Sequence, residues 1–384
     1  MPVADAFAAA LERLLPPGRA PRLAVAVSGG ADSTALALLA HAYCKARGGV
    51  VLALTVDHGL RAEAADEARL TASRLVARGM DCQVLTLNLR PGAAMQERAR
   101  QARHEALARA AAEAGFLYLA FGHHQDDQNE TVAMRARRGH GGMEGIAAWS
   151  ARNDVVLIRP LLGVASAALR HYLREQGIEW VEDPSNQSTK FERVRVRQAN
   201  GGMPPWGAAG RSAREQEAAD FLARQARLYP EGYAVLDATA VPPAALAVLL
   251  RTIGGRGHTP RQEAVLRLTT SLRAATLGGV RIAPAGRLGP GWLLAREPAA
   301  CAPPVPATSH ALWDGRFVLT SKPQGMVSFG ALGQDATKFR GYDGLPSLVL
   351  RGLPALRDKQ GGVIFPVSAV FRPAMPATSR PFQA

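Results

Sequence analysis

The sequence predicts an α/β fold in which a parallel, doubly wound sheet is followed by a helical second domain and a small C-terminal α+β region. Two observations predict it. From Arg22 to about Arg159, nearly continuous apolar strands alternate with amphipathic helices, and the Gly/Pro cluster Gly201–Gly210 then separates this part from the rest. Such alternation is typical of a parallel sheet that helices cover on both faces.

The first part begins with a short amphipathic helix, expected over Met1–Leu15. Strands are expected over Leu23–Val27, Val50–Val56, Gln83–Leu87, Leu117–Phe121 and Val155–Ile158. Helices are expected over Ser33–Arg47, Glu63–Arg78, Met95–Ala114, Asp126–Arg138 and Ser166–Gln176. The second part is expected to hold helices over Ser212–Leu228, Pro243–Ile253 and Pro260–Leu272, a hairpin over Gly279–Arg296, a linker over Ala299–Pro306, and then short strands and turns. Open parallel sheets bind ligands beyond the carboxyl ends of their strands, so the loops after the strands are the places to examine.

The composition indicates a globular chain of two or three domains. The chain has 384 residues, of which 47% are apolar and 20% charged. It lacks a run of about 18 uncharged apolar residues, so no membrane span is expected, and its N-terminus lacks the features of a secretory signal. Cys44, Cys82 and Cys301 lie far apart, which argues against a zinc ribbon, an iron–sulfur cluster or a disulfide framework. We therefore expect a cytoplasmic protein.

The formal net charge of +14 indicates a polyanionic partner, and nucleic acid is the leading candidate. A GC-rich coding sequence also enriches Arg, so the charge alone does not decide. Two compact basic runs lie at Met134–His140 and Lys190–Arg197. Alternate residues of an extended segment point to the same side, so Arg193, Arg195 and Arg197 can line up along a phosphate backbone.

The loop Ser28–Ser33 carries the strongest chemical signal, because it reads Ser-Gly-Gly-Ala-Asp-Ser between an apolar strand and an Ala/Leu-rich helix. Two glycines let the backbone turn with positive φ and approach a ligand closely, and amide groups at a helix N-terminus attract phosphate. The loop lacks the spacing and the Lys of the common nucleotide triphosphatase loop. It resembles the pyrophosphate loop of enzymes that split ATP between the α and β phosphates. The alternative is an ordinary turn capped by Asp32.

The second signal is the segment Gly122–Thr131, which reads Gly-His-His-Gln-Asp-Asp-Gln-Asn-Glu-Thr. Asp127 and Glu130 share a helix face with Thr131. Opposite a phosphate loop, such carboxylates can hold Mg²⁺ or bind a cationic substrate. No Cys or third His completes a zinc set. A helix start stabilised by its own acids is the alternative.

Two weaker segments are expected near the same edge. Asp57 ends the second strand within Val56–Arg61, where it can frame adenine and ribose, although a polar turn explains it equally well. Arg100 lies in the basic helix Glu97–His104 and can clamp a phosphate or carboxylate. A solvated charged face is the alternative for this helix.

Five motifs in this order and spacing resemble the bacterial tRNA(Ile)-lysidine synthase family of pyrophosphate-loop ATPases, whose fold is adenine nucleotide alpha-hydrolase-like. The motifs are Ser-Gly-Gly-x-Asp-Ser, Val-Asp-His-Gly-Leu-Arg, Glu-x-x-Ala-Arg-x-x-Arg, Gly-His-His-x-Asp-Asp-Gln-x-Glu-Thr, and Glu-Asp-Pro-Ser-Asn with the Arg-rich run after it. The resemblance is strong over residues 20–200, moderate to Glu297 and weak after Cys301. The chain departs from the family pattern at His104, where Tyr is usual, and at Asn129, where Ala is usual.

The resemblance implies a reaction in two steps. ATP adenylates the C2 oxygen of the wobble cytidine in tRNA(Ile) with a CAU anticodon and releases pyrophosphate. The ε-amine of L-lysine then attacks C2 and expels AMP, which leaves lysidine and changes codon reading from AUG to AUA and charging from methionine to isoleucine. At pH 7 only about one lysine amine in 2,500 is neutral, so an acid near the attacking nitrogen must bind the cation and accept its proton.

The resemblance also implies roles for particular residues. The catalytic residues are expected to be Asp32, Arg100, His123 and Asp127, with His123 orienting the adenylate. ATP is expected to contact Ser28, Gly29, Gly30, Ala31, Asp32, Ser33, Asp57 and Gly122, and Asp32 is expected to hold Mg²⁺. Lysine is expected to contact Asp126, Asp127 and Glu130, with Asp127 as the base and the other two as alternates. tRNA is expected to contact Arg135, Arg137, Arg138, Arg193, Arg195 and Arg197.

The implied organisation is an ATP-pyrophosphatase catalytic domain at 1–205, a mainly helical tRNA-binding domain at 206–300, and a short C-terminal region at 301–384. ATP and Mg²⁺ are the implied cofactors, and tRNA(Ile) and L-lysine the implied partners, with no membrane and with a homodimer left open. Three other functions compete. They are tRNA thiolation, which generally needs a catalytic Cys or a cluster, amide-forming synthesis of asparagine, GMP or NAD, and tRNA binding without catalysis.

Overall fold

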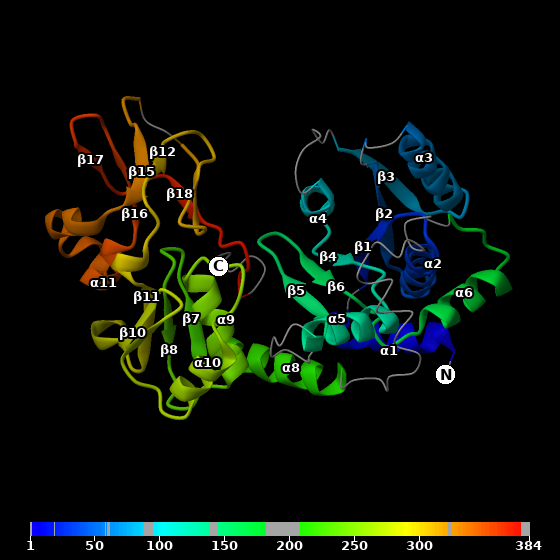
Figure 1. Cartoon of the computed structure of the whole chain (residues 1–384), viewed down its shortest axis with the longest axis horizontal. Coiled ribbons are helices and arrows are strands. Elements are labelled where there is room, and N and C mark those ends of the chain that lie inside the picture. The colour runs from blue at the N-terminus through cyan, green and yellow to red at the C-terminus, as the bar shows by residue number, and fades with distance from the viewer. Residues whose placement is uncertain are drawn as a thin grey trace. The chain divides into compact units, whose positions relative to one another are not determined.

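The computed structural model describes residues 2–18, 20–57, 59, 62–87, 95–137, 145–181, 208–321 and 324–377. The chain divides into two compact units, one comprising Met1–Ser150 with Asp154–Ser212 and the other Ala151–Asn153 with Ala213–Ala384 (Figure 1). Within the described ranges, no helix is both long and apolar enough to cross a membrane.

The first unit is built on a six-stranded sheet with the strand order β3-β2-β1-β4-β6-β5. The strands are β1 (Arg22–Val27), β2 (Val50–Asp57), β3 (Asp81–Thr86), β4 (Tyr118–Ala120), β5 (Trp149–Ala151) and β6 (Val156–Ile158). β1 pairs in parallel with β2 on one side and β4 on the other, with Leu23 opposite both Val51 and Tyr118. The strand order therefore reverses between β1 and β4, which is where doubly wound sheets bind ligands.

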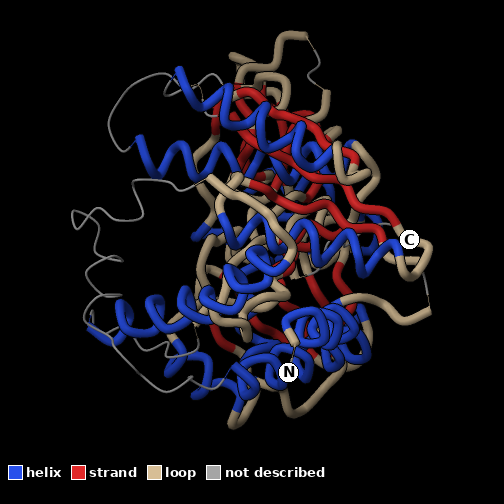
Figure 2. Tube along the Cα trace, turned by 90° about the vertical axis from the view of Figure 1, so that its right-hand side faces the viewer, coloured by secondary structure: helices blue, strands red, loops and turns tan. Residues whose placement is uncertain are grey.

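Helices cover both faces of this sheet (Figure 2). They are α1 (Val3–Leu14), α2 (Ala31–Lys45), α3 (Ala62–Val76), α4 (Met95–Glu113), α5 (Gln125–Arg137) and α6 (Ser166–Glu175). In β1, Leu23 and Val25 face the core that includes α1, α2 and α6, while Ala24 and Ala26 face the core that includes α4. Because successive strand residues point to opposite faces, a strand buried on both faces must be continuously apolar.

The second unit contains three antiparallel sheets, with the orders β7-β8-β11-β10-β9, β12-β15-β16-β17 and β13-β14-β18. The strands of the first sheet are β7 (Ala226–Leu228), β8 (Ala234–Leu236), β9 (Ala275–Leu277), β10 (Val280–Pro284) and β11 (Trp292–Arg296). The others are β12 (Val305–Pro306), β13 (Leu312–Trp313), β14 (Phe317–Leu319), β15 (Ser328–Ala331), β16 (Pro354–Arg357), β17 (Val363–Ile364) and β18 (Ala369–Phe371). The α-helices are α8 (Ala208–Gln225), most of which lies in this unit, α9 (Pro243–Ile253), α10 (Gln262–Thr269) and α11 (Ser347–Arg351), and the 3-10 helices are η2 (Gly286–Leu288), η3 (Pro298–Ala300), η4 (Gly333–Phe339) and η5 (Tyr342–Gly344).

The five-stranded sheet of the second unit is buried on both faces. Leu236 and Leu294 pack against the helices α9 and α10, whereas Val235 and Leu293 share a core with the C-terminal sheets. The boundary predicted at residue 300 therefore falls inside one compact unit. The division into three domains with separate roles stays a prediction.

The predicted fold class is confirmed, and the largest difference from the expected elements is the five-stranded sheet in the part that was expected to be mainly helical. Ala226–Leu228 forms strand β7 and does not continue the helix expected over Ser212–Leu228. The short strands β5, β8 and β9 were not predicted, because three residues carry too little periodicity to reveal a strand. The hairpin expected over Gly279–Arg296 is present as β10 and β11.

Candidate active site at the carboxyl edge of the first sheet

The phosphate-loop segment connects β1 to α2, as the sequence indicated. Gly29 has a φ of 84°, whereas Gly30 has a φ of −70° and precedes the first helical residue, Ala31. Only one of the two glycines therefore uses the positive φ that was expected of both. The Ser33 hydroxyl donates to the Gly30 carbonyl (3.0 Å) and accepts from the Ser28 amide (3.1 Å), which closes the loop on itself. The first-turn amides of α2 lie at the sheet edge, where a helix N-terminus favours an anion.

The loop after β4 comes very close to this first loop. A Cβ built on Gly122 would lie 3.2 Å from the backbone carbonyl of Asp32 and from the Cα of Ser33. Gly122 does not have a positive φ, so the requirement for glycine comes from the space and not from the backbone conformation. The two strongest sequence motifs therefore meet at the point where the strand order reverses.

Asp32 does not cap α2 but lies between the first residue of α6 and the loop before α5. Its Oδ1 accepts a hydrogen bond from the Ser166 hydroxyl (2.9 Å), and its Oδ2 lies 3.4 Å from Nε2 of His124. His124 is 5% exposed, whereas the Asp32 side chain is 30% exposed. The Asp32 carboxylate is therefore fixed by Ser166 and His124 but remains partly exposed to solvent. Such a carboxylate can bind a cationic or metal-bound group.

His124 is the residue that links the acids to one another. It precedes α5, where its Nδ1 accepts the Asp126 amide (3.2 Å) and its own amide donates to Oδ2 of Asp127 (3.0 Å). This is a reciprocal arrangement of the capping-box kind, in which a residue before the helix and one in its first turn satisfy each other's orphan donors. Asp127 thus has a structural task in addition to any chemical one. Its side chain remains 19% exposed, and that of Asp126 remains 42% exposed.

The charges in this cluster shift one another's pKa values. Burial alone would raise the pKa of Asp32, but hydrogen bonds from His124 and Ser166 and the positive charges of His124 and Arg170 together lower it. Burial alone would lower the pKa of His124, but the hydrogen bond to Asp32 and the negative charges of Asp127, Asp32 and Asp126 raise it. The cluster therefore favours an ionised Asp32 and a His124 with a raised pKa. A proton added at Nδ1 of His124 would face the Asp126 carboxylate (3.6 Å) and would replace the hydrogen bond that Nδ1 accepts from the Asp126 amide.

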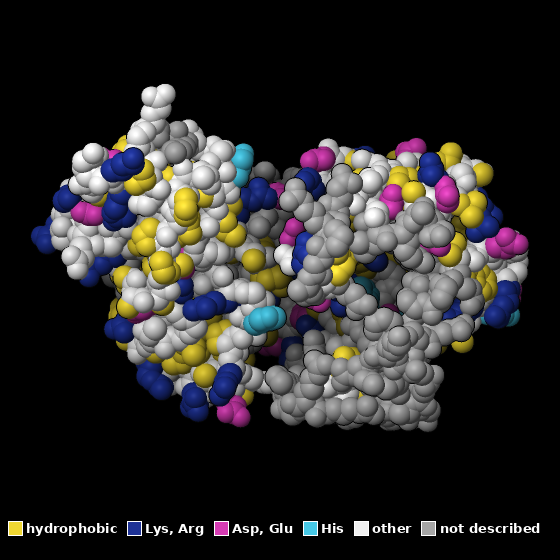
Figure 3. All heavy atoms as spheres, turned by 45° about the horizontal axis from the view of Figure 1, so that its top comes forward, with side chains coloured by type: hydrophobic (Ala, Val, Ile, Leu, Met, Phe, Trp, Pro, Cys, Tyr) yellow, Lys and Arg dark blue, Asp and Glu magenta, His cyan; other side chains and the backbone are white. Residues whose placement is uncertain are grey.

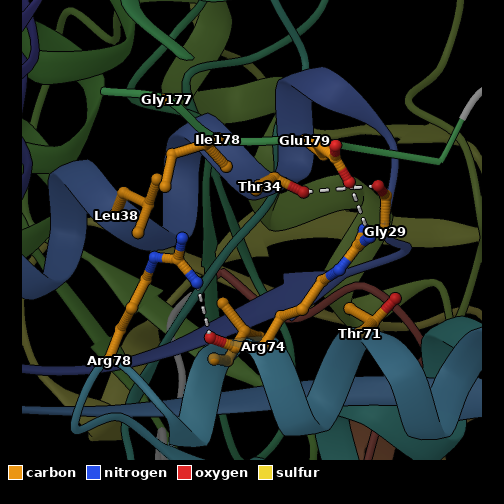
Figure 4. Close-up of a pocket in the computed structure, with 10 residues that line it drawn as sticks. Gly29, Thr34, Leu38, Thr71, Arg74, Arg78, Gly177, Ile178 and Glu179 are labelled. Atoms are coloured by element: carbon orange, nitrogen blue, oxygen red, sulfur yellow. Dashed lines mark hydrogen bonds and ion pairs between the residues drawn. The ribbon is translucent and has the colours of Figure 1, made fainter. Parts of the chain in front are cut away.

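A cavity of about 200 Å³ lies on the other side of the phosphate loop, between α2, α3 and the segment after α6 (Figure 4). Gly29 forms part of its wall, and Arg74 pairs there with Glu179 (3.2 Å). The Gly29 carbonyl accepts the Val181 amide (2.9 Å), and a Cβ on Gly29 would lie 2.6 Å from Oγ1 of Thr71. These contacts fix the backbone of the phosphate loop at Gly29. Asp32, Asp126 and Asp127 do not line this cavity.

Comparisons with known proteins decide the family. The model of the PP-loop domain family matches residues 3–200. The tRNA(Ile)-lysidine synthase of Hyphomonas neptunium is 38% identical over 67% of this chain and 77% of the relative. Those of Ruegeria pomeroyi and Rhizobium meliloti are 38% and 35% identical, and the matches cover 78% and 90% of this chain and 76% and 82% of the relatives.

The chain belongs to the tRNA(Ile)-lysidine synthase family. It is therefore a ligase of the PP-loop ATPase class, and its PP-loop domain is the ATP-using part. The resemblance read from the motifs is confirmed.

Four other predicted site residues differ from one another in exposure and contacts. Asp57 is 8% exposed and accepts the Gly59 amide (2.8 Å), so its carboxylate stabilises a polar turn at the end of β2. Glu130 is 4% exposed. Arg100 lies exposed on α4, and the ring of His123 lies 6.1 Å from that of Phe121. Their roles toward ATP and lysine stay predictions.

The predicted tRNA contacts of this synthase-family chain stay predictions as well. Arg138, Arg193, Arg195 and Arg197 lie outside the described residues. Arg135 and Arg137 belong to α5, but their side chains lie outside the described part. On the face shown in Figure 3, Lys and Arg side chains are spread over the surface and do not form a single patch.

Sequence reasoning missed His124 and Ser166. His124 is adjacent to His123, and neither histidine is of the residue types that usually begin a helix, so no local signal separated the two. Ser166 follows the last parallel strand and starts a helix, so the rule that ligands bind at the carboxyl edge already applied to it. Only the tertiary contact with Asp32 shows what its hydroxyl does.

Proposed function

We propose that this chain uses ATP to join L-lysine to C2 of the wobble cytidine of tRNA(Ile) with a CAU anticodon, through an adenylated tRNA, and releases AMP and pyrophosphate. The product, lysidine, then redirects the anticodon from AUG to AUA and charging from methionine to isoleucine. The observation that carries the proposal is the meeting of the phosphate loop with the acidic start of α5 around His124. Membership in the tRNA(Ile)-lysidine synthase family supports lysidine formation as the reaction of this site.

The phosphate loop suits the adenylation step. The α2 amides would hold the pyrophosphate of ATP, with Gly29 and Gly122 allowing the close backbone approach that a phosphate needs. A C2 oxygen leaves a pyrimidine ring poorly as it stands, and adenylation converts it into a good leaving group. Adenylation places charge on the departing pyrophosphate. The fixed backbone amides of the loop would stabilise that charge and so lower the barrier to adenylation.

Asp32 is the residue that fits Mg²⁺. The described residues contain no group of three or more His, Cys, Asp or Glu side chains that could hold a metal by themselves. Mg²⁺ is commonly bound by one or two carboxylates together with substrate phosphates, and the ionised, partly exposed Asp32 suits that arrangement. When bound there, Mg²⁺ would neutralise phosphate charge.

The acids at the start of α5 suit the lysine step. Asp126 and Asp127 both keep part of their carboxylates exposed, and one of them would bind the lysine ammonium and accept its proton. We keep Asp127 as the base, with Asp126 as the alternate. Glu130 is less suited, because its side chain is buried.

The cysteines argue against thiolation as the alternative. Burial raises the pKa of Cys44 to about 12, and burial also raises the pKa values of Cys82 and Cys301. A thiol is nucleophilic only when it ionises, so none of the three is poised for sulfur transfer.

The test is transfer of labelled L-lysine to unmodified tRNA(Ile) with a CAU anticodon, with and without ATP and Mg²⁺. We expect ATP-dependent label in one nucleoside, and no label when the wobble cytidine is replaced. Absence of transfer, together with tRNA-stimulated AMP release, would retain adenylation and reject lysine as the nucleophile.

Asp127→Asn tests the choice of base. We expect lysine transfer at saturating lysine to fall roughly 10²- to 10⁴-fold, while pyrophosphate release from ATP in the presence of tRNA continues. Asp126→Asn is the comparison variant, because Asp126 lies beside Asp127 in the same helical turn and also contacts His124. We expect it to raise the KM for lysine and to keep transfer at saturating lysine well above that of Asp127→Asn. Near-normal transfer by Asp127→Asn would exclude Asp127 as the base.

A further inference from the structure

Ser166 makes two hydrogen bonds that no role in the reaction yet accounts for. Its hydroxyl donates to Oδ1 of Asp32 (2.9 Å), and its backbone amide donates to Oδ2 of Asp126 (3.1 Å). Ser166 is only 8% exposed, so water competes little for either bond. One residue thus holds a carboxylate from the phosphate loop with its side chain and a carboxylate from the start of α5 with its main chain.

The position of Ser166 in α6 makes both bonds possible. It is the first helical residue, so its amide has no partner within the helix and is free to donate to Asp126. Leu169 and Leu173, farther along the same helix, are fully buried in the core below the sheet. The helix start therefore cannot move without disturbing that core, and the serine is a fixed donor.

We propose that Ser166 is a positioning residue that sets the carboxylate of Asp32 for the ATP step through its hydroxyl and the carboxylate of Asp126 for the lysine step through its amide. The proposal rests on the proposed function, since it assigns the two acids to the two halves of that reaction. It deepens that function by making α6 the third element of the site, beside the phosphate loop and α5. The carboxylates themselves do the binding, and Ser166 acts through them.

Three substitutions separate the two bonds. Ser166→Ala removes the hydroxyl and keeps the amide. Ser166→Thr keeps both. Ser166→Pro removes both, and proline is well tolerated at the first position of a helix, where its missing N–H is not needed by the helix. The preceding Ala165 has φ −71° and ψ 143°, a conformation that a following proline permits.

We expect Ser166→Ala to weaken the ATP half of the reaction and leave the lysine half intact. Tightening or loosening a hydrogen bond to a charged group changes a rate or an affinity by roughly 10- to 100-fold. We expect the calorimetric Kd for MgATP, or the rate of tRNA-dependent pyrophosphate release without lysine, to worsen by that factor. The KM for lysine should remain within about twofold.

Ser166→Thr should restore the ATP half to within about threefold of the unmodified protein, because the hydroxyl is present again. Ser166→Pro should show the ATP defect of Ser166→Ala and, in addition, a KM for lysine raised by roughly tenfold. Ser73→Ala is the matched control, because the Ser73 hydroxyl donates to the Leu70 carbonyl within the same helix, α3 (2.9 Å). A thermal unfolding curve for every variant shows whether it is folded.

Two results would overturn the proposal. One is a Ser166→Ala protein with unchanged MgATP affinity and unchanged pyrophosphate release. The other is an ATP defect in Ser166→Ala that Ser166→Thr does not reverse, since that defect would come from packing. If Ser166→Pro does not fold, the alanine and threonine pair still decides the hydroxyl's role. Failure of the proposed function would be seen separately, as absent lysine transfer by the unmodified protein.

Discussion

Each unit of the molecule holds a carboxylate whose pKa is lowered despite burial, and the two are built differently. In the second unit, Asp314 is 2% exposed and accepts hydrogen bonds from Arg296 (2.8 and 2.9 Å) and Arg316 (2.7 Å). It also accepts the Ala302 amide (2.9 Å). In the first unit, Asp32 is 30% exposed and is held by the Ser166 hydroxyl and by His124.

The difference shows that a lowered pKa does not by itself identify a functional acid. Burial would raise the pKa of Asp314, and the two guanidinium groups and the amide lower it, but no part of the carboxylate is left for a ligand. The pKa of Asp32 is also lowered, but its partners are a hydroxyl and a histidine, and its side chain remains partly exposed. The exposed fraction of the side chain, and not the direction of its pKa shift, distinguishes the acid that can act on a substrate.

The Asp314 cluster also explains how the second unit is held together. Arg296, at the end of β11, additionally donates to the Gly279 carbonyl (3.0 Å), and Arg316 donates to the Gly352 carbonyl (3.0 Å). These bonds join the hairpin, the linker and the C-terminal sheets around one buried carboxylate. The linker expected over Ala299–Pro306 is therefore fixed at Ala302.

The largest effect is expected for Asp314→Ala. It would leave two guanidinium groups buried without their counter-ion, so the free energy of unfolding should fall by about 3–5 kcal/mol. Urea denaturation of the unmodified protein, of Asp314→Ala and of a control variant measures the free energy of unfolding. Asp335→Ala is the matched control, because Asp335 pairs with Arg357 and Lys338 at the surface, and its loss should cost about 0–1 kcal/mol. Equal losses in the two variants would contradict the structural role assigned to Asp314.

Asp32→Asn should show the opposite pattern. We expect tRNA-dependent pyrophosphate release to fall by at least about 100-fold, because the charge that fits Mg²⁺ and phosphate is gone. The free energy of unfolding should change by less than about 1 kcal/mol, since asparagine still accepts the Ser166 hydrogen bond. A variant that is active, or one that is mainly unfolded, would remove the distinction between the two carboxylates.

Gly122→Ala tests the contact between the two loops of the site. Its Cβ would be 3.2 Å from backbone atoms of Asp32 and Ser33, so one loop must shift by a few tenths of an ångström. We expect about a tenfold loss of lysine transfer, because catalysis is sensitive to such displacements. Gly163→Ala is the control, since its Cβ would meet no atom within 4 Å and its φ is not positive. Comparable losses in both variants would show that the approach of the loops is unimportant.

The smallest effect is expected in the pH dependence of stability. The pKa of His124 is raised in the folded protein, so its contribution is fully present below its ordinary pKa of 6.5 and is lost as the pH rises through the folded value. The pKa of Asp32 is lowered, so its contribution is present above 3.8 and is lost as the pH falls through the folded value. Between pH 6 and 9, the free energy of unfolding should therefore decline more steeply in the unmodified protein than in His124→Gln. Identical slopes in urea denaturation would show that His124 does not gain protons from its acidic neighbours.

Much of the first unit followed from local patterns. The continuous apolar runs predicted the strands of the parallel sheet because burial on both faces leaves no room for polar residues. The placement of the motifs after strands predicted that Ser28–Ser33 and Gly122–Thr131 would meet. Short strands such as β8, and the five-stranded sheet to which it belongs, could not be predicted, because antiparallel pairing between distant segments leaves little local trace.

The sequence by itself determined the fold class, the edge that holds the site and the family, because periodicity, glycine spacing and motif order are local properties of the chain. Only the tertiary structure decided which polar residues face one another. It placed His124 between Asp32 and the acids of α5, and it placed the hydroxyl of Ser166 on Asp32 across 134 positions of sequence. It also separated an acid with an open side from one that arginines enclose, since exposure depends on how distant segments pack.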